Sequence, residues 1–246
     1  MILRDIVFEN PSENIVFDEV LLRLAETSSD EESVRLWESS VYFVVLGRIC
    51  KMEDDIDMDG LKRDQIPFFR RCSGGGTVLQ GPGCLNYSLI LSKEKHPELR
   101  DLRRSYEVIL SKIVRELLPM GIEAVVLPIS DIALKEDEKK FSGNAQKRGK
   151  KFILHHGTIL YNFDLTRIER YLKMPLSVPE YRRGRAHHEF VGNLSLSQRQ
   201  VKEVLERSFP FKKKVQGLST QENKLLQEFL NTKNPLLAKG EDDDQC

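Results

Sequence analysis

The stretch that decides the fold is IPFFRRCSGGGTVLQGPGCLNYSLIL, residues 66–91. It contains three runs of mostly aliphatic, aromatic or β-branched side chains, a composition typical of strands: residues 66–71, 77–80 and 85–91. Short glycine-rich connections separate these runs, and none of them has room for a helix. Successive strands of a parallel sheet need a long crossover, usually helical, so this stretch favours a mixed sheet over a strictly alternating one.

Helices and further strands are expected on both sides of this stretch. Apolar residues recur at helical spacing over residues 14–26 and 99–118, and Pro119 and Gly121 end the second helix. Two later helices begin with capping boxes, in which a serine and the side chain three residues on satisfy free N–H groups: Ser197 with Gln200, and Ser219 with Glu222. Strands are also expected at residues 41–49, 124–129 and 152–161. The predicted fold class is α+β, a mixed β-sheet flanked by helices.

The composition is that of one globular domain. The chain has 246 residues, of which 40 % are hydrophobic, and 38 Lys and Arg balance 38 Asp and Glu. Zero formal net charge excludes a globally basic nucleic-acid coat protein. No linker divides the chain, so residues 1–232 are expected to form a single domain. Residues 233–246, with the run Glu241-Asp242-Asp243-Asp244, are expected to form a flexible acidic tail.

The cysteines and the apolar stretches limit the function classes further. Cys50, Cys72, Cys84 and Cys246 form no C-x-x-C pair and have no histidine at metal-ligand spacing, which indicates neither a zinc site nor a redox dithiol. The longest apolar runs are far below the roughly 20 residues of a membrane-spanning helix. The N-terminus carries neither a signal-peptide nor a transit-peptide pattern. We therefore expect a cytoplasmic protein with no membrane partner.

Two motifs contain groups suited to anions. In RRCSGGGTV, residues 70–78, three consecutive glycines let the backbone approach a ligand, and Arg71 could pair with a carboxylate or phosphate. No Gly-Lys-Ser/Thr follows, so this is not a Walker loop, and a glycine-rich hairpin turn explains it equally well. In KKFSGNAQ, residues 139–146, Lys140 is a mobile positive charge, although the lysines here also fit a solvated basic loop.

Two further motifs contain histidine or arginine. In LHHGTIL, residues 154–160, adjacent strand residues face opposite sides, so His155 and His156 cannot both chelate one metal from there. One of them is expected on the ligand side of the sheet and the other packed or at the surface. The stretch YRRGRAHHEF, residues 181–190, mixes basic and aromatic residues. It could bind RNA, but a surface loop with anchoring aromatics, or a docking site for an acidic partner, is the commoner explanation.

The order and spacing of these motifs, with Gly81-x-x-x-Leu85-Asn86-Tyr87-Ser88 between the first two, closely resemble those of the lipoate–protein ligase A family. The resemblance implies the catalytic-domain fold that this family shares with biotin protein ligases and class II aminoacyl-tRNA synthetases. It also implies an ATP-dependent ligase that forms lipoyl-AMP and then transfers the lipoyl group to a lysine. The implied acceptor is a lipoyl-domain protein: a 2-oxoacid dehydrogenase E2, a glycine-cleavage H protein or another lipoyl carrier. No nucleic acid is expected as a partner.

The same resemblance implies roles for individual residues. Lys140 is the expected catalytic residue, because it matches the family's lysine that holds the lipoyl carbonyl and phosphate oxygens. The residues expected to bind ATP and lipoyl-AMP are Arg71, Ser73, Gly74, Gly75, Gly76, Thr77, Val78, Leu79, Asp131, Lys140, Ser142 and Gly143. Those expected at the lipoyl pocket are Asn86, His156, Gly157 and Thr158. Mg²⁺ is expected to bind through the phosphates and, with Arg71 and Lys140, to offset the charge of the two reacting anions.

Departures from the family pattern leave alternatives open. Many members have a C-terminal accessory domain, so we expect a short form that works alone or with a separate accessory subunit. An octanoyl or lipoyl transferase acting between carrier proteins without ATP would need a nucleophilic cysteine. Residues 135–162 contain none, and Cys72 and Cys84 fit better as small buried residues. A non-catalytic binder that uses the basic clusters at 147–151 and 182–185 is the third class. Biotin ligation is disfavoured, because no G-R-G-R-x-G-R-type loop is present.

Overall fold

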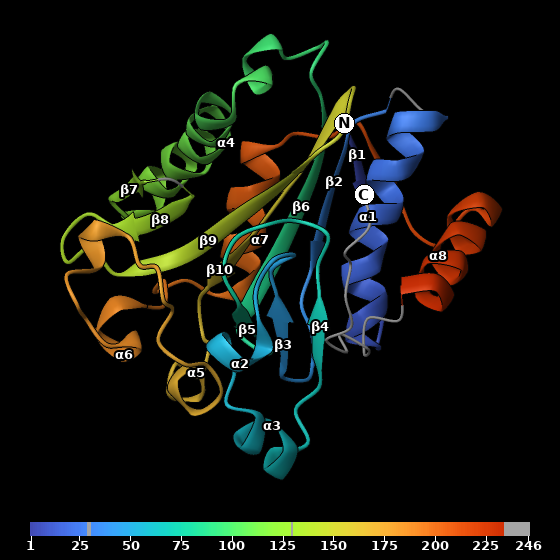
Figure 1. Ribbon diagram of the computed structural model, residues 1–246. Coiled ribbons are helices and arrows are strands. Elements are labelled where there is room, and N and C mark those ends of the chain that lie inside the picture. The colour runs from blue at the N-terminus through green and yellow to red at the C-terminus, as the bar shows by residue number, and fades with distance from the viewer. Residues whose placement is uncertain (29–30, 129, 234–246) are drawn as a thin grey trace.

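A large mixed sheet forms the centre of the molecule. The computed structural model describes residues 1–28, 31–128 and 130–233 (Figure 1). In chain order the elements are β1 (Ile2–Arg4), α1 (Pro11–Thr27), β2 (Ser33–Trp37), β3 (Phe43–Leu46), α2 (Met52–Asp55), α3 (Met58–Asp64), β4 (Phe68–Arg70), β5 (Val78–Gln80), β6 (Cys84–Ser92), α4 (Leu102–Leu117), β7 (Ala124–Leu127), β8 (Asp131–Leu134), β9 (Lys140–Arg148), β10 (Phe152–Leu160), α5 (Thr166–Tyr171), α6 (His187–Phe190), α7 (Gln198–Ser208), β11 (Lys213–Val215) and α8 (Thr220–Lys233).

Two sheets can be traced within these described residues. Eight strands are ordered β11-β1-β2-β6-β10-β9-β8-β7, and three more are ordered β4-β3-β5. Both sheets contain parallel and antiparallel pairs: β1 runs parallel to β2, β6 antiparallel to β10, β3 parallel to β4 and antiparallel to β5. The prediction of a mixed α+β sheet is therefore confirmed.

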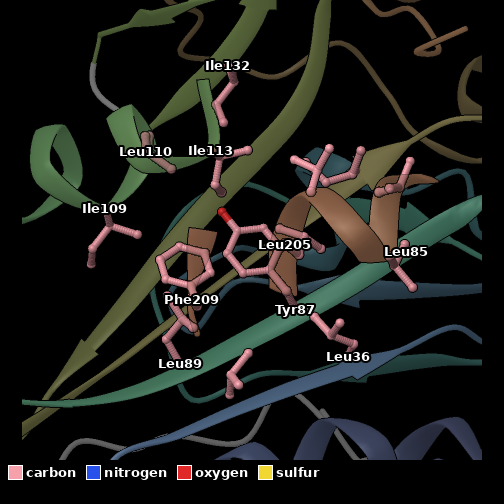
Figure 2. Close-up of a cluster of buried hydrophobic side chains, with 14 of the residues drawn as sticks. Leu36, Leu85, Tyr87, Leu89, Ile109, Leu110, Ile113, Ile132, Leu205 and Phe209 are labelled. Carbon is pink, nitrogen blue, oxygen red and sulfur yellow. The ribbon is translucent and has the colours of Figure 1, made fainter. Parts of the chain in front are cut away.

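The side-chain alternation of the central strands divides the molecule into two layers. Odd-numbered residues of β6 and β10, such as Leu85, Leu89 and Ile153, pack against α4 and α7. Figure 2 shows this core around Tyr87, whose ring stacks on Phe209 at 6.2 Å. Even-numbered residues of the same strands face α1, which is itself covered by α8 (Figure 1). Polar groups on this second face belong to the site described below.

The predicted helix signals are found in place. The apolar stripe of α4 is buried, from Tyr106 to Leu117, and Gly121 ends the following turn in a left-handed conformation. Both predicted capping boxes form at the starts of α7 and α8. Burial of these stripes against the sheet, rather than helix propensity alone, stabilises such helices.

The glycine-rich stretch is not a hairpin turn, and that interpretation is wrong. The strands before and after it, β4 and β5, are not neighbours, because β3 lies between them. The loop therefore crosses over the end of β3, where the Arg48 amide donates to the Ser73 carbonyl at 2.9 Å. A Cβ at Gly47 would lie 1.9 Å from the Gly75 carbonyl oxygen, so only glycine permits this crossing.

Other expectations have different outcomes. Residues 140–148 form strand β9, which lies between β10 and β8 in the sheet, not the solvated basic loop that the lysines taken alone would suggest. The predicted acidic tail falls almost entirely on residues 234–246, which lie outside the described residues. Among the helices of residues 1–28, 31–128 and 130–233, none is both long and apolar enough to cross a membrane.

Candidate functional site

A cavity of about 1050 Å³ lies between the two sheets. The glycine loop and β5 form one side, β6, β9 and β10 form the floor, and residues 175–191 form the opposite side. Most of the predicted site residues line it: Arg71, Gly75, Gly76, Thr77, Val78, Leu79, Asn86, Asp131, Lys140, Ser142, Gly143, His156, Gly157 and Thr158. Ser73 and Gly74 do not line it, and Ser73 is buried behind the loop. Residues from three widely separated parts of the sequence thus meet in one cavity.

Arg71 is the internal support of the glycine loop. Its Nη2 donates to the carbonyls of Gly74 at 2.7 Å and Gly76 at 2.8 Å, and its Nε donates to Ser73 Oγ at 3.0 Å. Gly75 between these carbonyls has φ +83°, a conformation that glycine adopts without strain. Burial lowers the pKa of Arg71 to about 10, which leaves the guanidinium charged at neutral pH. Arg71 therefore shapes the loop and brings a positive charge to the cavity wall.

A buried polar network connects this loop to the floor. Arg35, Ser88 and His156 lie side by side on β2, β6 and β10, in direct register and on the same face. Asp18 of α1 lies over this row and accepts from Arg35 at 2.9 Å, from the Ser88 hydroxyl and from His156 Nδ1 at 3.5 Å. Burial opposes ionisation of Asp18, but the hydrogen bonds and the positive charge of Arg35 hold its pKa below the usual carboxyl range.

His156 joins the glycine loop to this network. Its Nε2 lies 2.6 Å from Ser73 Oγ, which accepts from Arg71 Nε, and its Nδ1 lies 3.5 Å from Asp18 Oδ2. The glycine loop is thus held to the floor through one imidazole.

Lys140 is placed by a β-bulge. Along the β8–β9 pair, Ile132 faces Ser142 but Ala133 faces Lys140, so one extra residue of β9 is inserted here. Bulges of this kind re-aim side chains. The ammonium nitrogen of Lys140 lies 2.9 Å from Asp131 Oδ1, and its carbon chain passes over Gly143, where a Cβ would come within 3.0 Å. A glycine at position 143 leaves room for the lysine.

Tyr181 completes the environment of Asp131. Its hydroxyl donates to Asp131 Oδ2 at 2.6 Å, so both carboxylate oxygens have a partner. Burial, together with the neighbouring carboxylate, raises the pKa of Tyr181, which therefore stays protonated as a donor. An ammonium group, a carboxylate and a neutral hydroxyl group are thus fixed at one end of the cavity.

The other histidine of the pair faces the opposite side of the sheet. His155 is fully buried, its Nδ1 lies 3.1 Å from Gln146 Nε2, and the rings of Tyr87 and Tyr106 pack beside it. Burial lowers the pKa of His155 to about 3, so it stays neutral at ordinary pH. Of the two histidines, only His156 lines the cavity.

Of the cysteines that the structure describes, none lines the cavity, although the Cys50 thiol donates to the carbonyl of Gly75 on its wall at 3.3 Å. Cys84, the first residue of β6, is buried, and burial raises the pKa of its thiol. Cys72 packs at the edge of the core under α1. Cys84 therefore lacks the exposed, low-pKa environment that a thiol nucleophile needs. Within residues 1–28, 31–128 and 130–233, no cluster of His, Cys, Asp and Glu could hold a metal ion by itself.

Sequence reasoning missed several residues of the site. Asp18, Trp37, Asn144, Tyr181, Arg182 and Phe190 all line the cavity. The pattern of residues 181–190 predicts a surface loop or a partner-docking site, yet Tyr181, Arg182 and Arg183 line the cavity. Asp18 offered a usable signal, because a charged residue in the middle of an otherwise apolar helix face, between Phe17 and Val20, needs a buried partner.

Comparison with known proteins decides the family. The family model of the lipoyl protein ligase A/B catalytic domain matches residues 10–210. The chain belongs to this family. A probable lipoate-protein ligase A of Mycoplasma pneumoniae is 29 % identical over 164 residues, which are 67 % of this chain and 46 % of the relative. The chain thus spans about half the length of the curated relatives it matches.

Solved ligases share the fold. A bi-partite lipoate protein ligase of Thermoplasma acidophilum, studied with its E2 lipoyl domain, superposes with a TM-score of 0.79 at 23 % identity. The match covers 94 % of this chain and 91 % of that one. A lipoate-protein ligase A crystallised with ATP gives a TM-score of 0.78 at 24 % identity and covers 94 % of each chain. These similarities confirm the α+β ligase fold that the sequence motifs predicted.

Proposed function

We propose that this protein is a lipoate–protein ligase that activates lipoate with ATP and transfers the lipoyl group to a lysine of a lipoyl-domain acceptor. The observation that carries the proposal is the joint placement of Lys140 and the Arg71-supported glycine loop on the walls of one cavity. The cavity has the size of sites that take a nucleotide or a drug-sized ligand. The family of the chain and the ATP-bound ligase of the same fold support the same reaction.

In the first step a carboxylate oxygen of lipoate attacks the α-phosphorus of ATP. An oxygen–phosphorus bond forms, the bond to pyrophosphate breaks, and lipoyl-AMP and pyrophosphate result. Two anions must approach each other, and the ammonium group of Lys140 would offset their repulsion. Gly75 and Gly76 would let the backbone lie close to the nucleotide. Mg²⁺ would be held by the phosphates and would supply additional positive charge at the leaving pyrophosphate.

In the second step the neutral amine of the acceptor lysine attacks the carbonyl carbon of lipoyl-AMP. A carbon–nitrogen bond forms, the carbon–oxygen bond to AMP breaks, and the amine proton is released. Lys140 would stabilise the oxyanion that develops and the departing phosphate. The apolar lipoyl chain would lie toward Trp37 and Val78, with Asn86 and the stretch from His156 to Thr158 along its floor.

The direct test is Lys140→Met assayed in each half-reaction separately. We expect a loss of at least about 100-fold in lipoate-dependent exchange of pyrophosphate into ATP, and a comparable loss in acceptor modification from synthetic lipoyl-AMP. Lys139→Met is the matched control, because Lys139 is the adjacent lysine, does not line the cavity and pairs with Asp137. Full activity of Lys140→Met in both assays would remove Lys140 from the mechanism.

The transferase alternative makes a distinct prediction. If acyl groups passed through a cysteine thioester, Cys72→Ala with Cys84→Ala would abolish transfer from an acylated carrier protein. The buried thiol of Cys84 and the absence of both cysteines from the cavity wall disfavour it. We expect the double variant to keep its ATP-dependent activity.

A further inference from the structure

Arg182 is a buried cation without an acidic partner among the described residues. Arg182 is only 3 % exposed and lines the cavity. Its Nε donates to the Arg185 carbonyl at 2.9 Å, and its guanidinium lies 4.7 Å from the centre of the Phe190 ring. Its Nη2 is buried and makes no hydrogen bond to any residue that the structure describes. A donor of this kind is costly to leave unsatisfied, so it points to a ligand.

The neighbouring arginines do not share this property. Arg183 is exposed and pairs with Glu138 at 3.0 Å. Arg185 donates to the carbonyls of Asp137 and Tyr181, both at 3.0 Å. These contacts hold the segment against the β8–β9 hairpin, which carries Lys140. Arg183 and Arg185 anchor the segment, whereas Arg182, also on the cavity wall, keeps an unpaired buried donor.

Arg182 lies at the same end of the cavity as Lys140. Tyr181, the preceding residue, donates to Asp131, which pairs with Lys140. Phe190, on which the guanidinium rests, precedes Val191, and Val191 forms a β-bridge with Lys140. Asp131 pairs with Lys140, whereas no carboxylate of the described residues lies at salt-bridge distance from Arg182.

We propose that Arg182 binds a phosphate oxygen of the nucleotide beside Lys140. The inference rests on the proposed function, since it assigns a residue to the nucleotide of that reaction. A phosphate suits this position better than the lipoate carboxylate. A phosphate of the nucleotide stays in the cavity through both steps, whereas the carboxylate loses its negative charge when it becomes part of the mixed anhydride. The desolvation cost of a buried, unpaired guanidinium is offset only when an anion binds beside it.

The test is direct binding, independent of catalysis. ATP, AMP and lipoate are each titrated into the full-length protein by calorimetry, for the wild type, Arg182→Met, Arg182→Lys and the control Arg199→Met. Methionine keeps apolar contact with Phe190 but removes the charge. Arg199 is exposed on α7 and pairs only with Glu203 in the described chain. Thermal unfolding of every variant without ligand is measured in parallel.

We expect Arg182→Met to bind ATP and AMP about ten- to 100-fold more weakly, the loss of one charge-assisted hydrogen bond. Arg182→Lys should keep part of the affinity, and Arg199→Met all of it. Without ligand, Arg182→Met should be as stable as the wild type or more stable, because it removes an unpaired buried charge.

A purely structural role predicts the opposite pattern, a lower melting temperature with unchanged nucleotide affinity, and would overturn the proposal. Weaker lipoate binding with unchanged ATP and AMP binding would also overturn it, in favour of the carboxylate. If the wild type itself bound no ATP, the proposed function would fail with it.

Discussion

Replacement of His155 should change the acid sensitivity of this protein in a way that can be calculated. His155 is fully buried and its pKa is lowered to about 3, whereas a histidine in an unfolded chain titrates near 6.5. As the pH falls below about 6.5, the unfolded state takes up a proton that the folded state refuses, and stability decreases. Between pH 7 and 4.5 this one residue should cost about 2–3 kcal/mol. The contribution is fully present above the unfolded pKa and is lost progressively toward pH 3.

The assay is urea denaturation at half-unit steps from pH 7.5 to 4.5, on the wild type and His155→Gln. We expect the free energy of unfolding of the wild type to fall over this range and that of His155→Gln to fall less, by about 2–3 kcal/mol at the acid end. Absolute stabilities do not matter, because the two slopes are compared. His188→Gln is the comparison for an exposed histidine: the contact with Glu169 raises the pKa of His188, so this variant should shift the pH dependence in the opposite direction. Parallel curves for wild type and His155→Gln would refute the assignment of a buried neutral His155.

Two further predictions concern the walls of the cavity. Asp18→Asn and Arg35→Met should each lower the free energy of unfolding, measured by denaturant, by about 3–5 kcal/mol. The double variant should lose at least about 1.5 kcal/mol less than the sum of the two single losses. Strictly additive losses would contradict the buried pair. Gly157→Ala would place a Cβ 1.8 Å from Asn144 Oδ1. This variant should lower the free energy of unfolding by about 1–3 kcal/mol and weaken lipoate binding. An unchanged melting temperature would contradict this close contact.

Local signals in the sequence predicted much of the fold. The runs at residues 66–71, 77–80 and 85–91 are β4, β5 and β6, and the capping boxes mark the starts of α7 and α8. These features depend on neighbouring residues, through periodicity, turn chemistry and caps. Strand β9 was missed because its pattern is interrupted by glycine and crowded with lysines. Its pairing with both β8 and β10, a long-range contact, decides its conformation.

The site was predictable where motifs could be matched, and not where distant segments meet. The glycine loop, Lys140 and His156 come from matched motifs and share one cavity. The row of Arg35, Ser88 and His156 under Asp18 depends on strand register between segments far apart in the chain. No local pattern shows that register. Likewise, the bulge that aims Lys140 at Asp131 exists only in the pairing of β8 with β9.

The central claim is that this chain makes and uses lipoyl-AMP in the cavity around Lys140. The most direct measurement is the intact mass of an apo lipoyl domain after incubation with the purified protein, lipoate and Mg-ATP, with parallel reactions that lack ATP or contain synthetic lipoyl-AMP instead. We predict one added lipoyl group with ATP or lipoyl-AMP, none without either, and a rate at least about 100-fold lower with Lys140→Met. An acceptor that stays unmodified with both lipoyl donors, or that is modified equally well without ATP, would contradict the claim.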